Sequence, residues 1–249
     1  MMVKKPDKKL LVGLDIGTTK ICAIVGRMNQ HGRLEILGMG RCQSEGVTRG
    51  LITNIEKTTQ GIVKAIEDAS IQSGVDIKVV NVGIAGQYIK SSTHKGSIMR
   101  DNPQDMISVE DVERLTNDMY KLVMPPGVQI IHVMPQDYTV DNETEVKDPV
   151  GMVGSRLEAD FHVIAARTDA VSNIIRSVHK ANLEIENIVL EPIASSMAVL
   201  MPEEKEAGVV LVDIGGGTTD IAMFYEGIIR HTAVIPFGGS IVTNDIKSG

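Results

Sequence analysis

Two short segments, far apart in the chain, carry the residue types that bind phosphate. The first, residues 15–20, reads DIGTTK and follows the apolar stretch 10–14. The second, residues 213–220, reads DIGGGTTD, follows the apolar stretch 209–212 and resembles an expanded copy of the first. Another apolar stretch follows each segment. One such loop is a weak signal, but two with matched strands predict two related lobes that face one phosphate-bearing ligand.

Glycine and threonine suit these segments to phosphate. Glycine lets the backbone approach an anion closely and adopt positive φ, and consecutive N–H groups in such a turn form an anion-binding concavity. Threonine hydroxyls add donors to the phosphate oxygens. Phosphate contacts are therefore expected from Gly17, Thr18, Thr19, Gly215, Gly216, Gly217, Thr218 and Thr219. Lys20 either reaches a phosphate as well or is simply a solvated lysine.

The aspartates of the two segments repel phosphate, so their presence makes sense if a cation lies between them and the ligand. Mg²⁺ suits this position because it takes oxygen ligands, keeps several waters and bridges to nucleotide phosphates. Asp15 and Asp213 are expected to hold the water shell of the ion, and Asp220 is the weaker candidate.

The alternative interpretation is a pair of ordinary β-hairpin turns, since Gly, Asp and Thr are common turn residues. Other phosphate-binding motifs are absent. The sequence has no GxxxxGK[ST], which excludes a P-loop protein, and no GxGxxG opens a helix after a strand, so a dinucleotide site is unsupported.

Composition is that of a globular protein. The 249 residues suffice for one large domain or two smaller ones, and 43% are hydrophobic. The formal net charge of −7 argues against nucleic acid as a partner. Cys22 and Cys42 are isolated, so a reduced, cytoplasmic setting is expected. The six His show no metal spacing. Residues 1–9 are basic, but Asp15 interrupts the apolar run that follows, unlike a secretory signal.

Hydrophobic periodicity predicts the elements of the first lobe. Strands are expected at residues 10–14, 21–26, 34–38, 77–85 and 185–190. A helix is expected at residues 55–73 with Gly74 as its stop, and another begins at Thr168 or Asp169 with Asn182 as a left-handed C-terminal residue. A third helix is expected at residues 193–200, with Pro192 in its first turn.

Residues 87–160 are more polar and richer in proline. Ser108 and Asp111 have the spacing of a capping box for a helix that runs to about Val123, and strands are expected at residues 128–134 and 138–140. A structureless connection of this length is improbable. The segment therefore predicts a small α+β module inserted in the first lobe. An apolar strand expected at residues 160–166 then returns the chain to the first lobe.

The second unit starts like the first and stops early. After its loop come a strand, a turn at Glu226-Gly227, a strand at residues 228–234 and a helix start at residues 241–246. The first unit goes on to further helices and strands. We therefore expect an incomplete second lobe and a chain that is the N-terminal part of a longer protein. The alternative, a complete short lobe, leaves a sheet face uncovered.

Several segments resemble known motifs. Residues 15–19 and 213–220 resemble the two phosphate motifs of the actin, Hsp70 and sugar-kinase superfamily, and residues 190–196 (LEPIASS) resemble its first connecting helix. The insertion after Ala85 resembles the subdomain 1C of one member family, FtsA, a family of bacterial cell-division proteins. The closing stretch 150–158 (VGMVGSRLE) and the junction 238–246 (GGSIVTNDI) are also similar to that family.

The resemblance implies an α/β protein with the actin-like (ribonuclease H-like) ATPase fold. Subdomain 1A would occupy residues 1–86 and 161–201, the inserted α+β subdomain 1C residues 87–160, and the truncated start of subdomain 2A residues 202–249. ATP and Mg²⁺ are the implied cofactors, with slow hydrolysis at most. Glu191 resembles the residue that orients the attacking water; otherwise it is an acidic residue favoured by the dipole at a helix start.

The resemblance also implies a cellular role. The protein would polymerise at the cytoplasmic face of the inner membrane at the division site, anchor FtsZ filaments and recruit later divisome proteins through subdomain 1C. The FtsZ-binding subdomain, the adenosine motif and a C-terminal membrane helix would lie beyond Gly249. Two alternatives remain: a PilM-like pilus assembly protein, and an enzyme such as a sugar kinase or an Hsp70-like ATPase. A kinase could use Asp220 as its base, but no sugar-binding cluster accompanies that residue.

Overall fold

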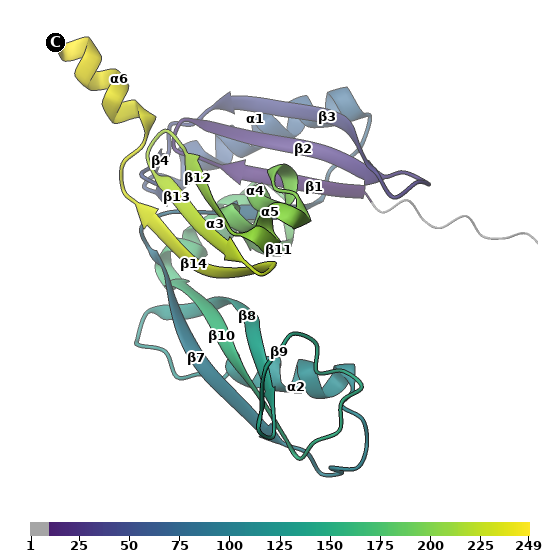
Figure 1. The fold of residues 1–249 in the computed structure, drawn as a ribbon. Helices are drawn as coiled ribbons and strands as arrows, with labels where there is room; N and C mark the ends of the chain where they lie inside the picture. The colour runs from purple at the N-terminus through teal and green to yellow at the C-terminus, as the bar shows by residue number, and fades with distance from the viewer. Residues whose placement is uncertain (1–9) are drawn as a thin grey trace, which may run out of the picture.

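The first lobe is built on a five-stranded mixed sheet (Figure 1). The computed structural model describes residues 10–249, so the basic segment 1–9 lies outside the described residues. Three strands form an antiparallel meander and two more join in parallel, in the order β11-β6-β1-β2-β3. Their bounds are β1 (Leu10–Ile16), β2 (Lys20–Met28), β3 (Leu34–Gln43), β6 (Val79–Ile84) and β11 (Glu184–Leu190). The five expected strands of this lobe are therefore present.

Two helices support this sheet. α1 (Ile55–Ser73) packs on β2 and β3, and α3 (Thr168–Lys180) packs beside α1 and against β11. The approach of α1 requires glycine on β3, because a Cβ added to Gly38 would lie 2.9 Å from the carbonyl oxygen of Ala69. α1 ends at Gly74 with φ 69°, as its sequence predicts. The opposite face of the sheet carries Asp15 and stays open to a ligand.

The insertion forms its own four-stranded sheet, in the order β7-β10-β8-β9, with α2 (Val109–Met119) packed on it. The strands are β7 (Ile89–Met99), β8 (Val128–Val140), β9 (Glu143–Val146) and β10 (Arg156–Arg167). The predicted capping box is present: the Asp111 N–H donates to Ser108 Oγ at 3.3 Å and the Ser108 N–H donates to Asp111 Oδ2 at 3.2 Å. A separate core around Leu115 and Phe161 makes the insertion the predicted α+β module.

Several details of the insertion differ from the sequence prediction. The sequence does not reveal β7, whose middle is polar; it forms because the whole strand pairs with β10. The two strands expected at residues 128–134 and 138–140 are one strand, β8, which continues through Pro135 beside a register shift in its pairing with β10. A bulge of this kind is where a strand tolerates proline. α2 ends at Met119 and not near Val123, since Val123 is 98% exposed and has nothing to pack against.

The strand β10 also changes the expected division of the chain. It pairs with β7 and β8 along its length, so residues 161–167, which the sequence assigns to the first lobe, belong to the sheet of the insertion. This sheet touches the second lobe as well. Ser91 Oγ donates to the Thr232 carbonyl oxygen at 3.1 Å, and Gln136 Nε2 donates to the Ile229 carbonyl oxygen at 2.8 Å.

The second lobe holds a three-stranded antiparallel sheet in the order β12-β13-β14. Its elements are α5 (Pro202–Ala207), β12 (Val209–Ile214), β13 (Thr219–Tyr225), β14 (Ile228–Ile235) and α6 (Gly239–Ser248), and α4 (Glu191–Val199) precedes them. α4 joins the lobes because it contacts β6 and β11 of the first sheet and β12 and β13 of the second. Among the helices of residues 10–249, none has both the length and the apolar character that crossing a bilayer requires.

Two small strands, β4 (Val47–Thr48) and β5 (Leu51–Ile52), form a hairpin between β3 and α1 that the sequence does not predict. The hairpin is short, but it is firmly held. The N–H groups of Thr53 and Asn54 both donate to the carbonyl oxygen of Gly46, at 2.9 and 3.1 Å. Val47 is buried in the core of the first lobe.

Candidate functional site

The two glycine-rich segments form hairpin loops with one backbone design. In each, four residues join the last paired residues of the two strands. The Gly17 N–H donates to the Lys20 carbonyl oxygen at 3.0 Å, and the Gly215 N–H donates to the Thr218 carbonyl oxygen at 2.9 Å. The second loop is therefore not an expanded copy of the first, as the sequence suggested, because the pairing gives both the same length.

Equal length changes which residues correspond. The first loop reads GTTK and the second GGGT, so Thr18 and Thr19 occupy the positions of Gly216 and Gly217. Asp15 is paired with Cys22 and Asp213 with Asp220, which puts a thiol in one hairpin where the other has a carboxyl group. The first loop thus offers hydroxyls and an amine, whereas the second offers mainly backbone N–H groups.

The tips of the two loops touch, although nearly the whole chain separates them in sequence. A Cβ added to Gly216 would overlap the side chain of Thr19, and one added to Gly217 would lie 2.7 Å from Thr18 Oγ1. Glycine is required at both positions because the opposite loop leaves no room for a side chain. Lys20 at the end of the first loop and Asp213 just before the second line one cleft.

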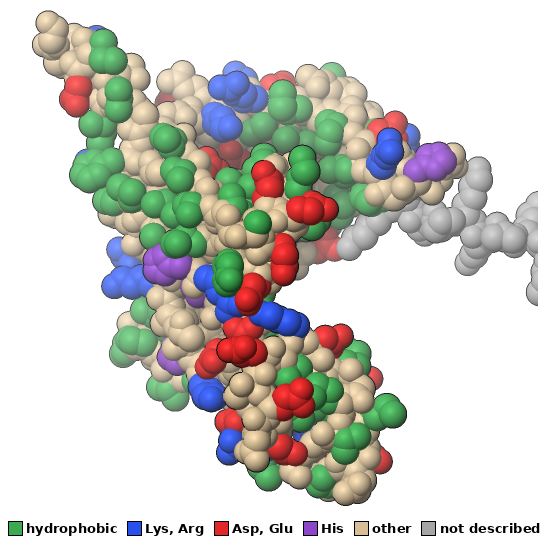
Figure 2. Space-filling model, viewed as in Figure 1, with side chains coloured by type: hydrophobic (Ala, Val, Ile, Leu, Met, Phe, Trp, Pro, Cys, Tyr) green, Lys and Arg blue, Asp and Glu red, His purple; other side chains and the backbone are tan. Residues whose placement is uncertain are grey.

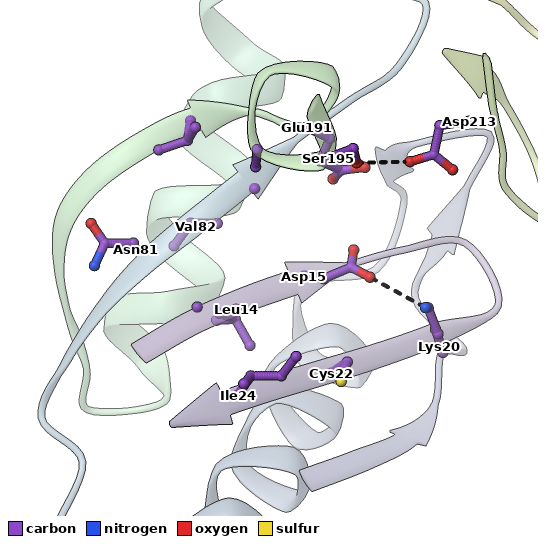
Figure 3. Close-up of a pocket in the computed structure, with 14 residues that line it drawn as sticks. Leu14, Asp15, Lys20, Cys22, Ile24, Asn81, Val82, Glu191, Ser195 and Asp213 are labelled. Carbon is purple, nitrogen blue, oxygen red and sulfur yellow. Dashed lines mark hydrogen bonds and ion pairs between the residues drawn. The ribbon is translucent and has the colours of Figure 1, made fainter. Parts of the chain in front are cut away.

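That cleft has a volume of about 430 Å³ and lies between the open face of the first sheet and α4. Asp15, Lys20, Glu191 and Asp213 line it and point into the same space (Figure 3). Asp15 Oδ2 lies 3.8 Å from Lys20 Nζ, and Ser195 Oγ donates to Asp213 Oδ2 at 3.0 Å. Ligand pockets commonly measure about 300–1,000 Å³, so the cleft has the size for a bound small molecule.

Carboxyl groups crowd this cleft. Burial raises the pKa of Glu191 to about 8, and the neighbouring Asp15, Asp220 and Asp213 add to the effect. Burial also raises the pKa of Asp15, against the lowering effect of Lys20. Like charges held close together disfavour ionisation of each. A cation in the cleft would relieve this repulsion, which favours a metal-bound ligand.

The last three residues of the second glycine-rich segment, Thr218, Thr219 and Asp220, do not line this cleft. Thr218 is buried, and Thr219 Oγ1 donates to the Phe237 carbonyl oxygen at 2.8 Å. Asp220 is buried too and lines a separate small cavity of about 20 Å³ beside Pro192. Burial raises its pKa to about 6, and its Oδ1 has no hydrogen-bond partner within residues 10–249.

The second loop is also fixed from behind by the start of α6. The Gly239 N–H donates to the Gly215 carbonyl oxygen at 2.9 Å, and the Ser240 N–H donates to the Gly216 carbonyl oxygen at 3.0 Å. With its carbonyl groups held in this way, the loop is firmly attached to the element that follows β14.

Metal binding by protein groups alone is not supported. In the part of the chain that the structure describes, no three His, Cys, Asp or Glu side chains gather in a way that could hold an ion. Mg²⁺ usually takes one or two carboxylates, several waters and the oxygens of a phosphate ligand. Asp15 and Asp213 suit that mode, since both face the cleft.

The sequence prediction missed Ser195 as a site residue. Its place follows from helix geometry, because Ser195 lies four residues after Glu191 on α4, and residues four apart share one face of a helix. The sequence could therefore have predicted Ser195 as a site residue from this spacing. The approach of the β4–β5 hairpin to the first loop had no such signal, as it depends on how the hairpin packs; the Gly50 N–H donates to Thr18 Oγ1 at 3.1 Å.

The architecture is similar to solved structures of low sequence identity. The PilM-PilN type IV pilus biogenesis complex aligns with a TM-score of 0.71 at 15% identity, over 96% of this chain and 65% of that one. The ethanolamine utilization protein EutJ from Carboxydothermus hydrogenoformans aligns with a TM-score of 0.53 at 18% identity, over 100% of this chain and 61% of that one. The fold is the actin-like ATPase fold that the resemblance implied.

Sequence comparison narrows this class to a family. The model for the SHS2 domain inserted in FtsA matches residues 86–165, and that for the cell division protein FtsA matches residues 210–249. FtsA of Pseudomonas aeruginosa is 46% identical over 246 residues, which are 98% of this chain and 58% of that protein. FtsA of Escherichia coli strain K12 is 36% identical over 245 residues, which again are 98% of this chain and 58% of that protein. The chain belongs to the FtsA family and spans 58% of the length of these relatives.

Proposed function

We propose that this chain binds ATP with Mg²⁺ between its two lobes. The observation that carries the proposal is the contact of the two glycine-rich loops beside a cleft that contains Asp15 and Asp213. Neighbouring backbone N–H groups, hydroxyls and an amine suit a triphosphate, and the paired aspartates suit the hydrated ion that accompanies it.

In this proposal, residues from both lobes contact the ligand. From the first lobe, Gly17, Thr18, Thr19 and Lys20 contact the phosphates, and from the second the N–H groups of Gly215, Gly216 and Gly217 do so. Thr218 and Thr219 shape the second loop, because one is buried and the hydroxyl of the other is already donated to Phe237. Asp15 and Asp213 hold waters of the ion, and Asp220 acts at longer range from its own cavity.

Glu191 is the proposed catalytic residue. It lines the cleft at the start of α4, where its carboxyl group is placed to orient the attacking water. Hydrolysis is slow at most in this proposal, and ATP acts chiefly as a clamp. A ligand that contacts both loops favours the closed arrangement of the lobes over any open one.

The cellular role follows from the family. We propose that the protein acts in cell division at the cytoplasmic face of the inner membrane, where it self-associates into filaments and anchors FtsZ. The insertion, with its own core, is the proposed contact for later divisome proteins. Binding of FtsZ and of the membrane is assigned to parts of the family's chain other than these residues.

A second candidate is a PilM-like role in pilus assembly. The observation in its favour is the TM-score of 0.71 with the PilM-PilN complex. Identity favours cell division, since it is 15% with that structure and 46% with the FtsA of Pseudomonas aeruginosa. Pull-down of FtsZ by the full-length protein supports the first role, and capture of a PilN-type peptide without FtsZ supports the second.

Calorimetry of ATP binding to the full-length protein, with and without Mg²⁺, tests the nucleotide proposal. Asp213→Ala should abolish the Mg²⁺-dependent part of the binding because the ion loses one of its two carboxylates. Asp76→Ala is the matched control, since Asp76 is an exposed aspartate remote from the cleft. Unchanged affinity in the Asp213 variant, with an unaltered melting temperature, would contradict the metal assignment.

A further inference from the structure

The hairpin of β4 and β5 contains a strained arginine. Thr48 pairs with Leu51, so Arg49 and Gly50 form a two-residue turn, with φ values of 50° and 76°. Positive φ at both central positions defines the type I′ turn, which favours Asn-Gly. An arginine at the first position is held in the left-handed region, which costs an L-residue with a Cβ conformational energy. Such strain persists where the side chain has a use.

A second turn of the same kind shows what that use can be. Glu226 and Gly227 connect β13 and β14 with φ values of 53° and 75°. The Glu226 carboxylate receives Arg230 Nη2 at 2.9 Å and also pairs with Lys147. The charged side chain at the strained position is thus engaged by two cations. Arg49 is exposed, and no side chain or backbone group among residues 10–249 forms an ion pair or hydrogen bond with its guanidinium, which leaves that group available to an added anion.

The turn lies against both phosphate loops. The Gly50 N–H donates to Thr18 Oγ1 in the first loop at 3.1 Å, and a Cβ added to Gly217 in the second loop would lie 3.1 Å from the Arg49 Cα. The hydrogen bond occupies a lone pair of the Thr18 hydroxyl and leaves its proton to be donated elsewhere. The strained backbone at Arg49 and a free hydroxyl proton therefore lie together where the loops touch.

Charge at the cleft favours the same conclusion. Asp15, Glu191 and Asp213 line it, and Lys20, the amine among its lining residues, is already paired with Asp15. A polyphosphate needs further positive charge, and arginine binds phosphate oxygens through two parallel N–H groups. The backbone of the hairpin is anchored because Val47 lies in the core, and this fixes the backbone position of Arg49.

We propose that Arg49 is a third phosphate contact, which joins the two glycine-rich loops in binding the phosphate chain of a nucleoside triphosphate. The inference rests on the proposed nucleotide function and adds a residue that neither loop contains. The strained turn is kept because it presents a guanidinium at the junction of both loops.

The test compares Arg49→Asn with Arg49→Lys in the full-length protein, by calorimetry with Mg²⁺ and ATP and by melting without nucleotide. Asn fits the turn better than Arg, so the Asn variant should melt at the same or a higher temperature. It should nevertheless bind ATP about tenfold more weakly or worse, through the loss of charged hydrogen bonds. Lys keeps the charge without the paired N–H groups and should recover part of the affinity.

Arg33→Asn is the control, because it removes the same charge from the exposed turn between β2 and β3 and should leave affinity unchanged. ATP affinity of Arg49→Asn within twofold of the unsubstituted protein overturns the inference. So does a fall in melting temperature that parallels the loss of affinity, since a purely structural turn predicts it. If the unsubstituted protein binds no nucleotide, the proposed function itself is overturned. If it binds ATP and the Arg49 variants bind with the same affinity, only the inference about Arg49 is overturned.

Discussion

The two glycine-rich hairpins share a backbone hydrogen-bond pattern and differ at three of their four loop positions. Both close with a hydrogen bond from the first glycine to the fourth residue, at 3.0 and 2.9 Å. The first fills its loop with threonines and a lysine, whereas the second fills it with glycines because Thr18 and Thr19 occupy the space opposite. Each loop therefore limits which side chains the other can contain, because the two pack against each other.

The sheets behind the hairpins differ as well. The face of β1 that belongs to the core of the first lobe is buried, and Leu14 there is 2% exposed. The equivalent face of β12 is open, and Val212 there is 50% exposed. Figure 2 shows hydrophobic side chains gathered over the second sheet. The same strand pattern thus supports a closed core in one lobe and an exposed apolar surface in the other.

The largest expected difference between the lobes is in core stability. Leu14→Ala should lower the free energy of unfolding of the 249-residue chain by about 3 kcal/mol, because it empties a packed site. Val212→Ala should lower it by less than about 0.5 kcal/mol, since the side chain is half in solvent. Urea unfolding measures both. Equal losses would mean that the face of β12 is covered in solution and that the contrast between the sheets does not hold.

Contact between the loops is tested by a double-mutant cycle. Gly216→Ala should cost roughly 1–3 kcal/mol of unfolding free energy, because the new Cβ overlaps the Thr19 side chain. Thr19→Ser removes the methyl group involved and should return about 1 kcal/mol in the double variant. Gly13→Ala, where nothing lies within 4 Å of the added Cβ, is the control and should have little effect. Additive losses would show that the loops do not touch.

The crowded carboxyl groups predict a pH dependence. The native pKa of Glu191, about 8, lies above its ordinary value of 4.5, so the native state binds the proton more tightly than the unfolded state does. The free energy of unfolding should therefore fall as pH rises from about 4.5 to 8. Glu191→Gln should flatten this fall and stabilise the protein at pH 8 by about 1–2 kcal/mol, allowing for partial solvent screening.

Denaturant unfolding at pH 5 and pH 8, without Mg²⁺ or nucleotide, measures the effect of Glu191. Glu203→Gln on α5 is the matched control, because Glu203 is exposed and should leave the pH profile as it is. A Glu191 variant with the pH profile of the unsubstituted protein would contradict the crowding of the cleft.

The smallest effects separate how the two aspartates are held. Ser195→Ala should weaken Mg²⁺-dependent ATP binding severalfold, in line with about 1 kcal/mol for one hydrogen bond, because Asp213 loses its donor. Lys20→Met removes a proposed phosphate contact together with an ion pair to Asp15 that is about half exposed, so it should cost more affinity than Ser195→Ala, and its effect should shrink as salt increases. Calorimetry at low and high salt distinguishes them. The same salt dependence for both variants would mean that the two aspartates are held alike.

Local sequence was sufficient for most elements of the lobes. Alternating apolar residues gave β1, β2 and β6, and the Ser108–Asp111 spacing gave the start of α2 with both cap hydrogen bonds present. These features depend on neighbours along the chain, which a single sequence displays. β7 was missed because its polar middle has no strand pattern and it forms only through its partner β10.

The candidate site was likewise predictable only in part from the local sequence. Glycine, threonine and aspartate types identified both loops, since a turn at the end of an apolar strand is a local property. The contact of Gly216 with Thr19 and the donation from Gly50 to Thr18 were decided by tertiary packing. Each is a distance between segments that no spacing along the chain encodes. The sequence alone therefore determined the chemistry that the protein carries, and the fold decided which of those groups face one another, because only packing brings remote segments within hydrogen-bond reach.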